Sequence, residues 1–114
     1  MMPKLKEKDV MRECEQLLGH RGYWFTRLHV ALPFTPDGRR FSIGQKGLPD
    51  YGVFHEKYPG FLMEVKRPGG TLSQHQLFKI CELQQAYRIA VAVVDSRESL
   101  EQWLNDHELK AQAA

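Results

Sequence analysis

The sequence has 114 residues, of which 42% are hydrophobic and 26% charged, and its formal net charge is +2. These proportions are typical of an ordinary globular protein and indicate one domain spanning residues 1–114. No apolar run is long enough to cross a membrane, and the charged start lacks the apolar segment of a secretory signal. Cys14 and Cys81 have no metal-binding spacing, so we expect reduced thiols in a cytoplasmic protein.

The first half of the chain predicts a helix, a strand and a long loop. Apolar residues recur at helical spacing over residues 5–21, and Gly22 is a typical stop. Residues 23–32 are aromatic and β-branched, as in a strand. Residues 33–49 are rich in proline and glycine, which predicts a loop or a ribbon that turns at Asp37-Gly38.

The second half adds three strands and two helices. Strands are expected at 51–55 and 61–66, with a turn over residues 56–60, and a helix is expected from Ser73 to about residue 87. The apolar run 89–95 predicts a central strand. A last helix, 97–108, is expected to end in a frayed tail. The order α-β-β-β-α-β-α predicts an α/β fold, in which helices flank a small mixed sheet.

Three charged residues stand out in the predicted strands. Side chains alternate along a strand, so Glu64 and Lys66 share one face. Asp50 begins the neighbouring strand, and antiparallel pairing would bring its carboxylate beside that of Glu64. Two close carboxylates favour a cation between them, and oxygen ligands suit Mg²⁺ or Mn²⁺. With Lys66 to stabilise charge on a phosphate, this group suits metal-assisted phosphodiester hydrolysis. Alternatively, the charges form a solvated ladder on an edge strand.

The motif residues resemble a known nuclease family. Pro49-Asp50 followed by Glu64-Val65-Lys66 resembles the PD-(D/E)XK signature, and the wider string with Gly47-Leu48, Leu72-Ser73 and Gln76 resembles the VRR-NUC branch, over roughly residues 7–100. The resemblance implies a restriction-endonuclease-like αβββαβ core. It also implies a stand-alone, structure-selective endodeoxyribonuclease, dependent on Mg²⁺ or Mn²⁺, that acts on branched DNA such as Holliday junctions. A homodimer and a phage or mobile-element origin are further implications, as is the Val65 carbonyl as a metal ligand.

Two helical residues are further candidates. Glu7 falls within the apolar arc of the first helix, so we expect it near the metal, and the resemblance places the family's first-helix glutamate there. The alternative is a solvated glutamate in a first turn. Gln76 completes a capping box with Ser73, and the resemblance also places it beside the active site, so both roles stay open.

The remaining candidates concern nucleic-acid binding. Arg39, Arg40 and Lys46 in the long loop, and Arg67 after the charged strand, could flank a phosphate-binding cleft. The five histidines have no ligand spacing. Trp24 and Trp103 are expected in the core.

Two other functions compete with the nuclease. One is a non-catalytic nucleic-acid-binding module with the same fold. The other is an unrelated α/β interaction protein whose charged strand is a solvated edge, which predicts no metal binding.

Overall fold

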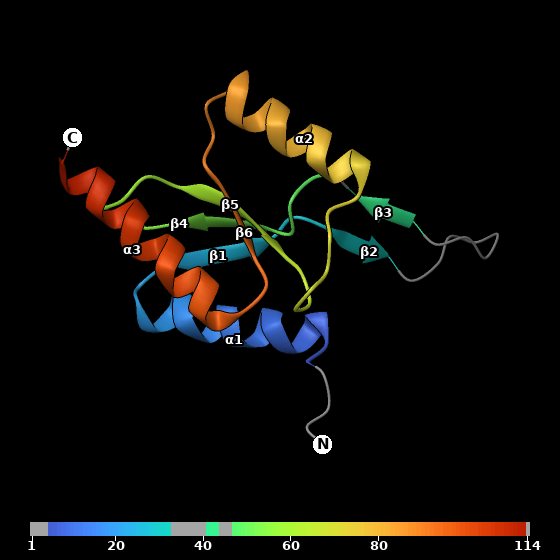
Figure 1. Cartoon of the computed structure of the whole chain (residues 1–114), viewed down its shortest axis with the longest axis horizontal. Helices are drawn as coiled ribbons and strands as arrows, with labels where there is room; N and C mark the ends of the chain where they lie inside the picture. The colour runs from blue at the N-terminus through green and yellow to red at the C-terminus, as the bar shows by residue number, and fades with distance from the viewer. Residues whose placement is uncertain (1–4, 33–40, 44–46, 114) are drawn as a thin grey trace.

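The computed structural model describes residues 5–32, 41–43 and 47–113, and in these ranges a four-stranded sheet separates two helices from a third (Figure 1). The mixed α/β architecture predicted from the sequence is confirmed. In chain order the elements are α1 (Glu7–His20), β1 (Trp24–Arg27), β2 (Val30–Leu32), β3 (Phe41–Ile43), β4 (Tyr51–Phe54), β5 (Phe61–Val65), α2 (Gln74–Gln85), β6 (Val91–Val94) and α3 (Arg97–Ala113).

The main sheet has the strand order β1-β4-β5-β6. The pairs β1–β4 and β4–β5 are antiparallel, whereas β6 runs parallel to β5. A parallel neighbour requires a crossover, and α2 supplies it between β5 and β6. The consequence for function is that β5, which carries Glu64, is an inner strand with a partner on each side.

The two faces of the sheet differ in composition. Met63 and Val65 point to the face covered by α1 and α3, where the buried core includes Cys14, Leu18 and Leu100. Because side chains alternate along a strand, Leu62 and Glu64 point to the opposite face. In Figure 1, α1 and α3 lie on one side of the sheet and α2 lies on the other. Glu64 therefore points away from the main core, toward the side of α2.

Three local expectations need correction. Residues 23–32 do not form one strand, because β1 ends at Arg27 and Val30–Leu32 pairs with β3 in a separate two-stranded ribbon. The ribbon alternative for the long loop is thus confirmed, although its proposed turn at Asp37-Gly38 lies outside the described residues. The expected frayed tail is also wrong, since α3 continues to Ala113, where alanine, lysine and glutamine are good helix formers.

Trp24 is the third correction. It was expected in the core, but its side chain is 64% exposed, whereas Trp103 is partly buried and packs on the core as expected. The alternation of β1 turns Phe25 inward and therefore Trp24 outward.

Among the described helices, none is long and apolar enough to cross a membrane.

Candidate active site

Asp50 is placed opposite Glu64 by the pairing of β4 with β5. Tyr51 pairs with Met63, so the residue before Tyr51 faces the residue after Met63. The Asp50 carboxylate accepts a hydrogen bond from the backbone N–H of Val65 at 2.8 Å, and its backbone oxygen accepts one from Leu28 at 2.8 Å. Asp50 is therefore held through both its side chain and its main chain. The predicted approach of Asp50 to the charged strand is confirmed.

Glu64 is a buried acid in an inner strand. Its exposure is 1%, and among the described residues it is the one charged residue that is buried. Its Oε1 accepts a hydrogen bond from Gln76 Nε2 at 3.1 Å, whereas its Oε2 is buried without a hydrogen-bond partner among the described residues. The alternative of a solvated ladder on an edge strand is wrong, because β5 is not an edge and Glu64 is not solvated.

Gln76 both completes the predicted capping box and contacts Glu64. Its Oε1 accepts from the Ser73 backbone N–H at 2.9 Å, and the Ser73 hydroxyl accepts from the Gln76 backbone N–H at 3.2 Å. This is the predicted capping box. The same side chain donates from its amide nitrogen to Glu64. The helix cap thus fixes the orientation of the amide that holds the buried carboxylate.

The loop before Asp50 packs directly on the start of α2. Gly47 has a φ of +83°, which favours glycine. A Cβ built at this position would lie 2.5 Å from the backbone oxygen of His75. Only a residue without a side chain can approach this closely. Gly47 therefore lets the segment leading to Asp50 contact the helix that presents Gln76.

Burial and neighbouring acids shift the ionisation of Glu64. Its pKa rises from 4.5 to about 8. Loss of solvation on burial is the largest cause, followed by the negative charge of the nearby Asp50 carboxylate. Lys66 acts in the opposite direction, and Glu7 adds a small further rise. A proton or a cation between the carboxylates would relieve their mutual repulsion, so the site favours a positive charge there.

Lys66 lies on the same face as Glu64, as predicted. Its Nζ is 3.9 Å from Glu64 Oε1, and its side chain is 16% exposed. At this separation the ammonium acts as a nearby charge more than as a hydrogen-bond donor. Its partial exposure leaves it accessible to a ligand that approaches the sheet face from solvent.

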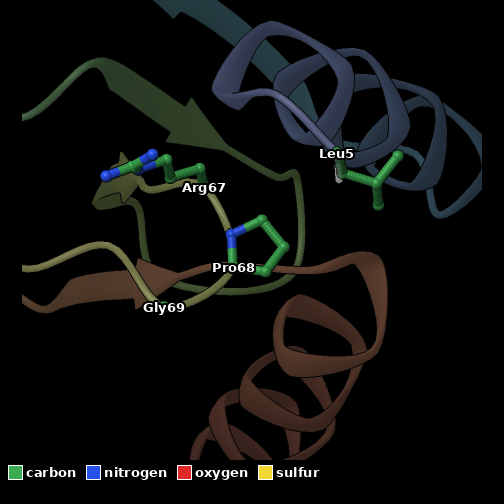
Figure 2. A pocket seen from close by; sticks show the side chains of 4 residues that line it. All are labelled: Leu5, Arg67, Pro68 and Gly69. Atoms are coloured by element: carbon green, nitrogen blue, oxygen red, sulfur yellow. The ribbon is translucent and has the colours of Figure 1, made fainter. Parts of the chain in front are cut away.

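Arg67 is exposed and lies beside a cavity of about 340 Å³. Figure 2 shows Leu5, just before α1, on one side of this cavity and Pro68 on the other, with the Arg67 side chain extending away from Leu5. A turn from Arg67 to Gly70, closed by a 2.8 Å backbone hydrogen bond, shapes this wall. Arg39, Arg40 and Lys46, the other predicted nucleic-acid contacts, lie outside the described residues.

Glu7 does not lie on a buried stripe. It is exposed at the first position of α1, whereas Val10, Cys14 and Leu18 of the same helix are buried. The helical-wheel argument fails because Glu7 belongs to the first turn of the helix, where its side chain stays exposed. Its charge nevertheless contributes to the raised pKa of Glu64, so Glu7 lies within electrostatic range of the site.

The residues present fit a hard divalent cation. Asp50 and Glu64 supply carboxylate oxygens from adjacent strands, and the unpartnered Oε2 of Glu64 is an available donor. In residues 5–32, 41–43 and 47–113, no group of three or more His, Cys, Asp and Glu side chains is arranged to hold a metal. A two-carboxylate set is what Mg²⁺ commonly uses, with water and phosphate oxygens completing its shell.

No protein-family model matches the chain, and no curated protein matches it. The family resemblance therefore stands on the motif residues themselves.

The sequence reasoning missed two features of this sheet face. It did not foresee the contact between Gly47 and α2, although a glycine three residues before Asp50 in a loop was a usable signal. It also missed the exposed Trp24–Phe54 pair, which strand alternation on either side of Phe25 and Val53 could have revealed.

Proposed function

We propose that the protein is a metal-dependent nuclease with a restriction-endonuclease-like core of the VRR-NUC type. The observation that carries the proposal is the buried Glu64 carboxylate, with one unpartnered oxygen, facing Asp50 and lying 3.9 Å from Lys66. A carboxylate with these surroundings costs stability unless a proton or cation compensates it. An apolar residue would pack there more favourably, so a chemical role gives a reason for the acid.

The proposed roles follow from the contacts. Asp50 and Glu64 would hold Mg²⁺ or Mn²⁺, with the Val65 carbonyl as a further ligand by resemblance and Glu7 in reach through water. The cation would polarise the phosphodiester and lower the pKa of a water. Lys66 would stabilise negative charge that develops on the phosphate.

Gln76 would act as a positioning residue. Both ends of its amide are engaged, one with the Ser73 backbone and one with Glu64. It therefore restrains the rotamer of Glu64, whose other oxygen, Oε2, has no hydrogen-bond partner among the described residues.

The proposed substrate is DNA with a structural feature, such as a flap or a four-way junction. Arg67 and the lysines at the start of α1 would contact phosphates, which provides affinity without sequence readout. We also propose a homodimer, because Leu77 and Phe78 on α2 are large and apolar yet exposed. Sedimentation of the wild type and of Phe78→Asp tests this assembly.

The decisive experiment is cleavage of labelled duplex, single-stranded, flapped and four-way-junction DNA with Mn²⁺, Mg²⁺ or EDTA. We expect metal-dependent cutting by the wild type and none by Lys66→Ala or Asp50→Asn. Lys110→Ala, which removes an exposed lysine at the end of α3, is the matched control and should cut normally.

The competing function is a non-catalytic nucleic-acid-binding module. The exposed Arg67 beside a cavity is compatible with it. Binding of DNA without cutting by a folded wild type, together with no heat of metal binding in calorimetry, would reject the nuclease in favour of the module.

A further inference from the structure

Two aromatic side chains lie exposed on the sheet face that carries Glu64. Trp24 of β1 and Phe54 of β4 are directly paired across the strands. Their side chains are 64% and 48% exposed, and their ring centroids are 5.8 Å apart with planes inclined by 37°. Single exposed aromatics are common on protein surfaces, but a neighbouring pair in one cross-strand position is a concentrated apolar surface.

The Phe54 ring lies close to the backbone of two glycines. A Cβ built on Gly60 would lie 2.7 Å from the ring, and one built on Gly52 would lie 3.3 Å from it. These two glycines therefore allow the ring to lie close against the sheet. This packing restricts the ring, so a flat ligand that stacks on it loses little side-chain entropy on the protein side.

A cavity of about 380 Å³ adjoins the pair and is lined also by Gly22, His55 and Glu56. His55 is engaged at both ring nitrogens, with the Lys57 N–H at 3.0 Å and the Arg21 carbonyl at 3.3 Å. Glu56 is the carboxylate of this lining. It repels a phosphate and can accept hydrogen bonds from the amino group of a base, so the cavity suits a neutral planar group.

We propose that the Trp24–Phe54 pair stacks an unpaired nucleobase of the substrate. The inference rests on the proposed function, because the ligand is the DNA that reaches Glu64 along the same face. By the register, Phe54 lies level with Gly60, four residues from Glu64 on the neighbouring strand. At about 3.3 Å per residue this is ~13 Å, or about four stacked nucleotides from the site at ~3.4 Å each.

Stacking of this kind selects strands whose bases are not paired. A base inside a duplex has both faces covered, whereas a base in a flap, gap or single strand offers one to an aromatic ring. The pair would thus supply the preference for structured DNA without reading sequence. Phosphate contacts near the carboxylates and base contacts four nucleotides away would together set the cutting position relative to a branch.

The test measures tryptophan fluorescence with oligonucleotides in EDTA, so that no cleavage is needed. The probes are a mixed-sequence single strand, the same strand made abasic over its central nucleotides, and a blunt duplex. We expect quenching by the intact single strand alone. Trp24→Ala should weaken single-strand binding, measured by anisotropy of a labelled probe, by roughly 5- to 150-fold. Trp24→Phe should restore binding without the quench.

Tyr87→Ala is the matched control, because Tyr87 is 66% exposed but lies beyond the end of α2. It should bind like the wild type. Equal quenching by the abasic strand, unchanged binding by Trp24→Ala, or Trp24 emission that shifts with protein concentration in the absence of DNA would overturn the proposal, the last by indicating a second copy on the pair. Quenching in a protein that never cuts would reject the nuclease and keep the stacking site, whereas cutting without quenching would do the reverse.

Discussion

Replacing Glu64 by glutamine should change how stability depends on pH. The pKa of Glu64 is raised from 4.5 to about 8 in the folded protein, so folding takes up a proton between these values. The stability that protonation of Glu64 contributes to the fold is fully present below pH 4.5 and is lost as the pH rises toward 8. Glu64→Gln keeps an acceptor for Gln76 and replaces the unpartnered oxygen with an amide that can donate to Asp50. The stability of the variant therefore does not fall over this pH range.

The magnitude follows from the shift. Each pH unit between the two pKa values changes the free energy of unfolding by about 1.4 kcal/mol. Between pH 5 and pH 7 the stability of Glu64→Gln relative to the wild type should therefore rise by about 2 to 3 kcal/mol. Above pH 8 the difference should level off, because Glu64 is then ionised in both states.

The assay is urea unfolding at half-unit steps from pH 5 to pH 9, in EDTA and again with Mn²⁺. Glu101→Gln is the control, since Glu101 is exposed on α3 and its variant should follow the wild-type curve. Mn²⁺ should stabilise the wild type most at high pH, where no proton competes for the carboxylates, and should leave Glu64→Gln nearly unchanged.

Parallel stability curves for the wild type and Glu64→Gln would refute the reasoning. They would mean that the carboxylate titrates normally in the folded protein, and hence that burial and Asp50 do not act on it as the geometry implies. A pH-dependent difference without any effect of Mn²⁺ would keep the electrostatic argument and reject the cation.

Three further outcomes are expected. Gln76→Ala removes the donor to the buried carboxylate and half of the capping box, so urea unfolding should show a loss of about 1 to 3 kcal/mol. Gly47→Ala should destabilise more than Gly69→Ala, because both have positive φ but only Gly47 faces backbone within 3 Å; the strain alone costs about 1 to 2 kcal/mol, and equal losses would contradict the close contact. Burial raises the pKa of Cys14 to about 12, so iodoacetamide at pH 8 should label the half-buried Cys81 and spare Cys14 until urea unfolds the chain, as mass spectrometry would show.

The sequence by itself determined the elements that have a strong internal period. The apolar spacing of α1 and the continuous apolar run of β6 each predict one element, and both elements are where they were expected. The alternation of β5 likewise placed Glu64 and Lys66 on one face. The Ser73 capping box was readable because all its members lie within one helical turn. These features depend on local geometry, which the residue types set directly.

Only the tertiary structure decided which side chains of these elements are buried and which contact each other. The burial of Glu64 depends on β5 having neighbours on both sides, and the hydrogen bond from Gln76 depends on α2 packing across the sheet. The exposure of Glu7, at the first position of α1, depends on how this helix packs against the sheet. Such facts come from register and packing between segments distant in the chain, about which a local pattern carries no information.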